Sequence, residues 1–265
     1  MPAFDAAASA ELLQAMTAIG VRAALLVRGE FGKAGVHRKD DGSPVTGADL
    51  AAEAAIRADL SGLAPALPVV SEEQAEPQTV ADDESYFLVD PLDGTREFIA
   101  GRDEYTINIA LMNKGAPLLG IIVAPALGLI WRGIVGHGAE RLTFAADGNI
   151  SPPSSIHTRP QPQREPVVLV SRSHLDPRTQ ALLGGLPQPR TIACGSAVKF
   201  CRVAEGFADL YPRLGPTRDW DVAAGHAIVE AAGGRVLTPD GTPLRYRTPE
   251  LLIPGFIACG QAQKS

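Results

Sequence analysis

Two carboxylates and a hydroxyl follow one apolar run, and their types and spacing indicate metal and phosphate chemistry. The apolar residues 86–89 predict a buried strand, and Asp90, Asp93 and Thr95 come directly after it. Gly94 and Thr95 predict a turn that opens a short helix, whose first N–H groups can face an anion. Carboxylates beside an anion repel it unless a cation lies between them. The run therefore favours a hard metal ion, Mg²⁺, that holds a phosphate.

Two further acids could complete a site for two metal ions. Glu72 follows a short apolar run at residues 68–70, and Asp221 stands near the start of a predicted helix at residues 219–231. Two Mg²⁺ ions about 3.5–4 Å apart need bridging carboxylates, because one acid cannot neutralise both ions. For a two-metal site these two acids would have to converge with the acid pair after the first strand, in a cleft between two halves of the chain. Asp219 could serve in place of Asp221, or could cap the helix.

The first half of the chain predicts two helices and then a largely antiparallel sheet. Apolar residues at helical spacing predict a helix over about residues 5–28. The polar segment 29–44 predicts a mobile loop. Thr46 and Asp49 then form a capping-box pattern before a second helix that ends near Leu60. Strands are expected at residues 68–70, 86–89, 106–112, 117–123 and 129–135, with a hairpin turn at Lys114-Gly115.

Residues 149–166 are rich in Ser, Pro, Gln and Arg, which predicts a long connection between two subdomains. Beyond it strands and helices alternate, so we expect a second α/β layer. The strands are expected at residues 167–170, 191–193 and 208–211, and the helices at residues 177–183, 196–205 and 219–231. The predicted fold is α/β (α+β), with an N-terminal α+β subdomain over residues 1–150 and a C-terminal α/β subdomain over residues 151–265.

The composition excludes several classes of protein. The 265 residues carry a formal net charge of −6 without a basic stripe, which argues against binding of a nucleic-acid polymer. Cys194, Cys201 and Cys259 have no metal-ligand spacing and indicate reduced, buried thiols in a cytoplasmic protein. We find no secretory signal pattern and expect no membrane span. A peripheral position on the cytoplasmic face of the inner membrane, and the choice between monomer and homodimer, stay open.

A different phosphatase chemistry is disfavoured by the acid spacing. Haloacid-dehalogenase-like phosphatases use a nucleophilic Asp with an acid/base Asp two residues later. In this chain Asp90 and Asp93 are three residues apart, with Pro91 between them. This spacing favours metal coordination and an activated water over an aspartyl-phosphate intermediate.

Several motifs together resemble the inositol monophosphatase superfamily over nearly the entire chain. The segments are Ser-Pro-Val-Thr-x-x-Asp at 43–49, Ser-Glu-Glu at 71–73, Asp-Pro-Leu-Asp-Gly-Thr-Arg-Glu-Phe-Ile at 90–99 and Trp-Asp-x-Ala-Ala-Gly-His at 220–226. Further segments at 195–201, 204–206, 210–213 and 254–256 resemble the CysQ-type branch, the 3′(2′),5′-bisphosphate nucleotidases. The resemblance implies a layered αβαβα sandwich of the sugar-phosphatase type, with the site in the cleft between the subdomains.

The resemblance also implies roles for individual residues. Glu72, Asp90 and the main-chain carbonyl of Leu92 would bind a first Mg²⁺, and Asp90, Asp93 and Asp221 a second; a third ion stays open. Thr95 with Asp49 would activate the attacking water, with Glu72 among the catalytic groups. The implied substrate contacts are Glu72, Leu92, Asp93, Gly94, Thr95, Ser196, Lys199, Asp221, His174 and Arg213.

The implied reaction is hydrolysis of adenosine 3′,5′-bisphosphate to AMP and phosphate, a lithium-sensitive step that would clear a by-product of sulfate assimilation. A lysine is a compact point charge, so Lys199 is the best candidate to hold the second phosphate. Arg96 stands where many relatives carry lysine. Two alternatives remain: inositol phosphate or fructose 1,6-bisphosphate as the substrate on the same scaffold, and a catalytically silent metal- or nucleotide-binding module.

Overall fold

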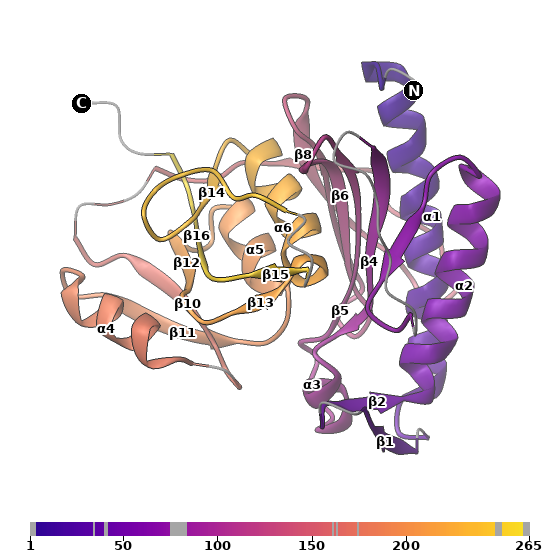
Figure 1. Cartoon of the computed structure of the whole chain (residues 1–265), viewed down its shortest axis with the longest axis horizontal. Coiled ribbons are helices and arrows are strands. Elements are labelled where there is room, and N and C mark those ends of the chain that lie inside the picture. The colour runs from indigo at the N-terminus through magenta and orange to yellow at the C-terminus, as the bar shows by residue number, and fades with distance from the viewer. Residues whose placement is uncertain are drawn as a thin grey trace.

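Helices and sheets alternate in five layers, as the resemblance implies (Figure 1). The computed structural model describes residues 4–33, 35–39, 42–74, 84–160, 162, 164–173, 175–246 and 251–261. Two long helices cover the outer face of a seven-stranded sheet, and two more helices fill the space between it and a five-stranded sheet. A further helix lies beyond the five-stranded sheet (Figure 1).

The outer layer consists of α1 (Ala6–Glu30) and α2 (Gly47–Leu63). The Asp5 carboxylate caps α1 by accepting from the Ala8 N–H at 2.8 Å. Among the described residues, α1 alone is long and apolar enough to cross a membrane by length and composition, although no membrane-length apolar run was expected. Half of that apolar window is buried, because α1 packs on α2 and on the strands of the large sheet.

The seven-stranded sheet has the order β3-β4-β5-β6-β7-β8-β9 and is antiparallel except for the β3/β4 pair. The predicted hairpin is confirmed, with positive φ at Lys114 (52°) and Gly115 (75°). Two strands at one side of this sheet were not predicted, β8 and the edge strand β9. The strands are β3 (Val69–Ser71), β4 (Ser85–Asp93), β5 (Thr106–Asn113), β6 (Ala116–Ala124), β7 (Leu129–Ile134), β8 (Gly138–Thr143) and β9 (Ser154–Ile156).

The expected mobile loop between the first two helices contains a small hairpin instead. Strands β1 (Val36–Arg38) and β2 (Pro44–Thr46) pair antiparallel across residues 39–43, of which 40 and 41 lie outside the described residues. Strands of three residues, of which β1 is exposed and β2 half-buried to buried, carry too little apolar alternation to be recognised in the sequence. The hairpin leads directly into α2 and brings Lys39 toward the large sheet.

The second half forms a five-stranded sheet of order β11-β10-β12-β16-β14, with a two-stranded sheet of β13 and β15 beside it. The predicted helices are confirmed as α4 (Pro177–Gly185), α5 (Val198–Ala204) and α6 (Asp219–Ala231). The strands are β10 (Val167–Ser171), β11 (Arg190–Cys194), β12 (Leu210–Arg213), β13 (Thr217–Arg218), β14 (Arg235–Leu237), β15 (Leu252–Ile253) and β16 (Phe256–Cys259). The division near residue 150 stays a prediction.

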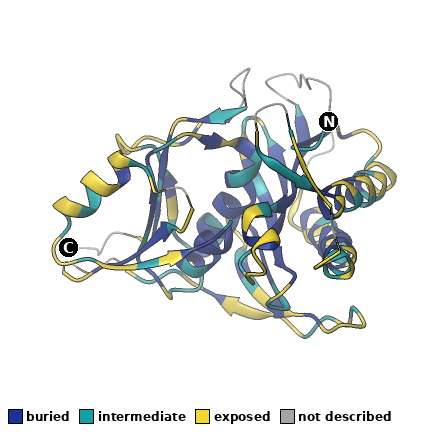
Figure 2. Ribbon diagram, turned by 90° about the horizontal axis from the view of Figure 1, so that it is seen from below, coloured by how far each residue is buried: buried dark blue, intermediate teal, exposed yellow. Residues whose placement is uncertain are grey.

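Helix α6 lies between the two sheets, and glycines let it approach its neighbours closely. A Cβ added at Gly120 of β6 would lie 2.6 Å from the Ala224 carbonyl oxygen of α6. A Cβ at Gly225 would lie 2.3 Å from the Phe200 ring of α5. Figure 2 shows that burial concentrates in the strands and in the helices between the sheets. This packing fixes the N-terminus of α6 against the edge of the large sheet.

Candidate active site

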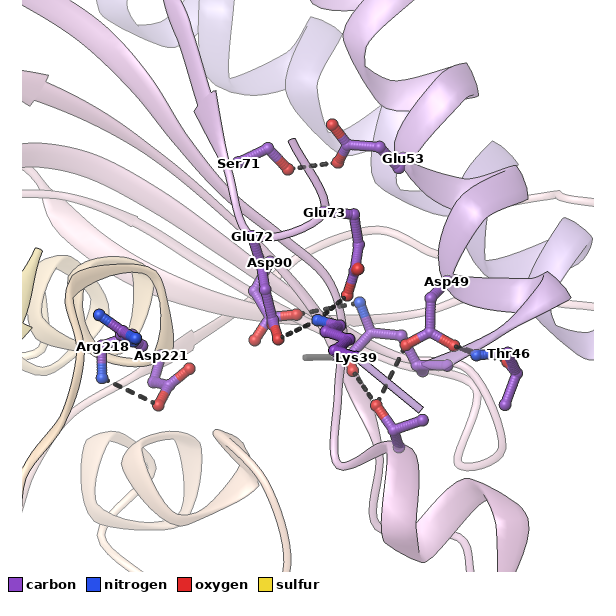
Figure 3. Close-up of polar contacts among 12 residues, drawn as sticks. Lys39, Thr46, Asp49, Glu53, Ser71, Glu72, Glu73, Asp90, Arg218 and Asp221 are labelled. Atoms are coloured by element: carbon purple, nitrogen blue, oxygen red, sulfur yellow. Dashed lines mark hydrogen bonds and ion pairs between the residues drawn. The ribbon is translucent and has the colours of Figure 1, made fainter. Parts of the chain in front are cut away.

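Three carboxylates from distant segments meet at one edge of the large sheet. Strands β3 and β4 run parallel with Ser71 opposite Val89, so Glu72, just after β3, lies beside Asp90, which is still paired with Asn108 of β5. Carboxylate oxygens of Glu72, Asp90 and Asp221 all lie within 4.8 Å of one another (Figure 3). The structure therefore brings an acid from the second half of the chain to the two acids at the strand ends.

Asp221 is held in place by the start of α6. It lies in the first turn of the helix, where its Oδ2 accepts from the Thr217 hydroxyl and from the Arg218 N–H at 3.2 Å. These contacts satisfy a donor at the helix N-terminus and fix the carboxylate. The carboxylate therefore reaches the cleft from a rigid element.

Asp90 is fully buried and only half satisfied. Its Oδ1 accepts from the Leu92 N–H at 3.0 Å, and its Oδ2 has no hydrogen-bond partner in the part of the chain that the structure describes. A buried carboxylate without compensation is costly, so the site needs a cation or a proton. Three carboxylates with an orphaned oxygen suit a hard divalent ion, which takes oxygen ligands. The residues present thus fit the metal ions that the sequence predicts.

The proximity of the acids raises their pKa values. Burial, and then the charges of Glu72, Asp93 and Asp221, raise the pKa of Asp90 well above its ordinary value. Burial raises the pKa of Glu72 to about 7; Lys39 opposes this and the Asp221 charge adds to it. Burial and the Asp221 charge raise the pKa of Asp93 to about 6, against Lys199 and Arg213.

Without metal, the protein should therefore lose stability as pH rises through this range. Glu72 has an ordinary pKa of 4.5 in the unfolded chain and about 7 in the folded protein. Between these values the folded state binds more protons, so the contribution of Glu72 to stability is fully present below pH 4.5 and is lost as pH rises through about 7. In this range the free energy of unfolding falls by about 1.4 kcal/mol for each pH unit and each extra proton bound by the folded state. Tm should therefore drop by about 5 °C from pH 5 to pH 7.5.

Thermal melts of EDTA-treated protein at the two pH values measure this slope. Glu72→Gln should flatten the slope, since the amide has no proton to lose, and saturating Mg²⁺ should flatten it in the wild type. A Tm that rises with pH more steeply in the wild type than in the variant contradicts the electrostatic account.

Asp93 and Leu92 stand beside the three-carboxylate cluster. The Asp93 carboxylate interacts electrostatically with Asp221 and accepts a hydrogen bond from the Ala197 N–H, which favours its charged form. The Leu92 side chain is buried, and its carbonyl oxygen accepts from the Thr95 hydroxyl at 3.2 Å. A register shift in the β4/β5 pairing between Asp90 and Asp93 turns the chain at this point.

The predicted water-activating pair is in hydrogen-bond contact. The Thr95 hydroxyl lies 3.1 Å from Asp49 Oδ1, while Asp49 Oδ2 accepts from the Thr46 N–H at 2.8 Å and from the Thr46 hydroxyl at 2.5 Å. The predicted capping box is thus confirmed, and it orients Asp49. Burial raises the pKa of Asp49, against the hydrogen bonds from Thr46 and Thr95.

Lys39 is a site residue whose role the sequence does not reveal. Its Nζ donates to Glu72 Oε1 at 2.8 Å and to Glu73 Oε1 at 2.5 Å (Figure 3). The lysine thus supplies positive charge to the carboxylate edge from the β1/β2 hairpin. No spacing in the sequence connects a lysine at 39 with acids at 72 and 73, so only the tertiary pairing could find it.

A cavity of about 390 Å³ opens beside these acids, between the two halves of the chain. Both glycine turns, at Gly94 and Gly195, lie on its wall together with Ser196. Tyr211, Trp220 and Phe256 add aromatic surface that the sequence analysis did not assign to a site. The charged lining residues are Lys39, Glu72, Asp93, Arg96, Glu97, Lys199, Arg213, Arg218 and Asp221.

Lys199 differs from a solvated helix lysine. Its side chain is nearly buried, and its Nζ donates to the carbonyls of Cys194 at 3.3 Å and Ser196 at 2.5 Å, over the Tyr211 ring. Arg213 lies on the same wall. Burial opposes its charged form, but Tyr211 and the charges of Asp221 and Asp93 outweigh burial and raise the pKa of Arg213. His174, another predicted substrate contact, lies outside the described residues.

His226 has a structural role, as its helix position suggests. It is nearly buried, with Nδ1 at 2.9 Å from the Tyr246 hydroxyl and Nε2 at 3.1 Å from Glu230. The three cysteines are buried and unpaired, as the sequence predicts.

Comparison with known proteins agrees with this geometry. The model of the inositol monophosphatase family matches residues 9–263. A 3′(2′),5′-bisphosphate nucleotidase CysQ of Shigella flexneri is 43% identical over 229 residues, covering 83% of this chain and 87% of the relative. The CysQ of Escherichia coli K12 is 44% identical over 223 residues, with the same coverage.

Solved structures give the same result. The crystal structure of CysQ from Bacteroides thetaiotaomicron, described as a bacterial member of the inositol monophosphatase family, has a TM-score of 0.80 and 33% identity, covering 95% of this chain and 98% of that one. An inositol monophosphatase of Thermotoga maritima shares the fold, with a TM-score of 0.77 at 22% identity over 94% of this chain and 92% of that one. The chain therefore belongs to the inositol monophosphatase family.

Proposed function

We propose that this phosphatase is a Mg²⁺-dependent 3′(2′),5′-bisphosphate nucleotidase that hydrolyses adenosine 3′,5′-bisphosphate to AMP and phosphate. The observation that carries the reaction type is the meeting of Glu72, Asp90 and Asp221, with an orphaned Asp90 oxygen, at the wall of a cavity. The printed names of the 43–44% identical relatives support the substrate class.

The acids divide between two Mg²⁺ ions in this proposal. Glu72, Asp90 and the Leu92 carbonyl would hold one ion, and Asp90, Asp93 and Asp221 would hold the other, so Asp90 would be shared between them. When bound, the ions polarise the phosphate and lower the pKa of coordinated water. Because the family is metal-dependent and the carboxylates repel one another without a cation, metal binding also removes the electrostatic penalty described above.

Thr95 and Asp49 handle the proton of the attacking water. Asp49 is held by Thr46, so its Oδ1 stays directed at the Thr95 hydroxyl. When Thr95 donates its proton to Asp49, the Thr95 oxygen can accept the proton of the water that attacks the phosphate. A buried Asp49 with a raised pKa is suited to receive a proton in this way.

The cavity wall opposite the acids holds the rest of the nucleotide. Gly94 has a φ of 90°, and a Cβ there would lie 3.0 Å from the Glu104 carbonyl oxygen, so the turn requires glycine; the scissile phosphate would lie at this turn, on the cavity wall. Lys199 and Arg213 supply positive charge for the second phosphate, and Ser196 contributes a hydroxyl. We place the reaction in the cytoplasm, in clearance of a by-product of sulfate assimilation.

Phosphate release from a substrate panel tests the proposal. With Mg²⁺, we expect the highest kcat/KM for adenosine 3′,5′-bisphosphate, and lower values for inositol 1-phosphate and fructose 1,6-bisphosphate. Lithium should inhibit, and EDTA should abolish turnover. Faster turnover of either sugar phosphate than of the nucleotide would assign the same chemistry to the alternative substrate class.

A further inference from the structure

Contacts across the cleft join the loop before β5 to two segments of the second half. Glu104 accepts from Arg172 through both carboxylate oxygens, with Nη2 to Oε1 at 2.9 Å and Nε to Oε2 at 3.0 Å. The same Oε2 also accepts from the Gly195 N–H at 2.8 Å. Nearby, Glu97 accepts from the Ser173 hydroxyl at 2.7 Å. Two acids of the first half thus hold residues 172–173 and 195 of the second half.

The contact at Gly195 is tight as well as polar. A Cβ at Gly195 would lie 2.8 Å from the Glu104 carbonyl oxygen and 2.9 Å from Glu97 Cγ, so only glycine allows this approach. The next residue, Ser196, has a φ of 45°, a backbone conformation that surrounding contacts must maintain. The residue immediately before Ser196 is Gly195, whose N–H donates a hydrogen bond to Glu104. Glu104 therefore helps to fix the backbone where the cavity wall begins.

The segment that Glu104 holds carries the groups on the nucleotide side of the cavity. Ser196 and Lys199 line the cavity, and Lys199 Nζ donates to the Ser196 carbonyl. The Ala197 N–H donates to Asp93, which ties the other end of the segment to the acids. A displacement of Gly195 would thus move Ser196 and Lys199, while Asp93 stays anchored on β4.

Electrostatics are consistent with a strong contact. Burial alone would raise the pKa of Glu104, but the hydrogen bonds from Arg172 and from the Gly195 N–H outweigh it and lower the pKa. A bidentate arginine–carboxylate pair fixes geometry better than a single-point ion pair. Glu104 is not among the described residues that line the cavity. Its effect on the substrate must therefore pass through the segment that it holds, which begins at Gly195.

We propose that Glu104 is a positioning residue for substrate specificity, which sets the place of Ser196 and Lys199 and thereby the preference for a nucleotide that carries a second phosphate. The inference rests on the proposed nucleotidase function. Glu104 acts from the N-terminal half on a wall formed by the C-terminal half, so the two halves together determine which phosphate ester is preferred.

The test compares adenosine 3′,5′-bisphosphate with adenosine 3′-monophosphate, which has the same scissile phosphate but lacks the second one. In Glu104→Gln the amide cannot accept from both Arg172 and Gly195 without turning its NH₂ toward a donor. We define the ratio as kcat/KM for the bisphosphate divided by kcat/KM for the monophosphate. Loss of a charge-assisted hydrogen bond should lower this ratio about tenfold or more, mainly because KM for the bisphosphate rises. The kcat values should change much less.

A matched control is Asp59→Asn, which removes the carboxylate of the exposed Arg22–Asp59 pair away from the cavity and should leave the ratio unchanged. Arg172→Lys keeps the charge but loses the fork, so it should shift the ratio in the same direction by less; it decides the question if Glu104→Gln does not fold.

Two results would overturn the inference. An unchanged ratio in Glu104→Gln, or an equal loss for both substrates, would leave Glu104 a purely structural residue while the nucleotidase function stands. A wild-type ratio near one would contradict the proposed function itself, and the inference with it.

Discussion

Asp90→Asn should lower kcat/KM for the bisphosphate about a thousandfold or more. Asp90 is the proposed bridge between two Mg²⁺ ions, and it is the one member of the three-carboxylate cluster that is completely buried. An amide offers one neutral oxygen in place of two charged ones and cannot neutralise both ions. Metal ions stabilise the charge of the transition state of phosphoryl transfer by several kcal/mol. Loss of that stabilisation raises the barrier enough to account for a roughly thousandfold decrease in kcat/KM.

The same substitution should stabilise the metal-free protein. At pH 7.5 it removes a carboxylate whose charged form is disfavoured by burial and by the charges of Glu72, Asp93 and Asp221. Its Oδ2 also lacks a hydrogen-bond partner among the described residues. We therefore expect a higher Tm in EDTA and a much smaller increase in Tm on addition of Mg²⁺. Thermal melts with and without Mg²⁺ measure both effects.

Asp209→Asn is the matched control, because Asp209 is also buried but fully paired. Its carboxylate accepts from Arg159 at 2.6 and 2.7 Å and from the Val167 N–H at 2.7 Å. Its loss should lower Tm whether or not metal is present. An Asp90→Asn protein that is less stable in EDTA and still responds fully to Mg²⁺ would show that Asp90 is structural and that the ions bind elsewhere.

The strand ends of the candidate site could be predicted because local sequence determines them. The apolar run before Asp90 and the short one before Glu72 both form buried strands, and parallel pairing carries their ends to one edge of the sheet. The Thr46–Asp49 capping box is equally local, since it spans a single helical turn. Side chains that a strand end or a helix start fixes are thus accessible to sequence reasoning.

The groups that depend on tertiary packing were predicted less well. Lys39 reaches Glu72 and Glu73 from a hairpin that was expected to be a loop. Lys199 stays a predicted phosphate contact, but its burial and its hydrogen bonds to the carbonyls of Cys194 and Ser196 were not predicted. Both outcomes depend on which segments approach each other, and residue spacing along the chain does not specify that.

The sheet of the second half shows the same limit. Strands β14 and β16 have three and four residues and lie in glycine- and proline-containing segments, so their periodicity is too short to detect. The longer β10 and the helices α4 and α6 were predicted close to their observed bounds. The convergence of Asp221 with Glu72 needed the family resemblance, because no local pattern links residues so far apart.

Thr95→Val should lower kcat by about two to four orders of magnitude while leaving metal binding nearly intact, the range expected for loss of a positioned proton acceptor. Valine keeps the shape of threonine but has no oxygen to receive a proton from the attacking water or to pass its own to Asp49. Kinetics with the bisphosphate and the Mg²⁺-induced shift in Tm measure the two quantities.

The decisive result is whether kcat and the Mg²⁺-induced shift in Tm change together or independently. In the carboxylate variants both should fall together, whereas in Thr95→Val only kcat should fall, because Thr95 contacts Asp49 and the Leu92 carbonyl through its hydroxyl and supplies no carboxylate to the cluster. Thr143→Val, on an exposed strand position remote from the cavity, controls for the change of side chain. If Thr95→Val retained wild-type kcat, proton transfer would have to pass through another group, and the hydrogen bond between Thr95 and Asp49 would serve only to hold the short helix α3 (Thr95–Ile99) against α2.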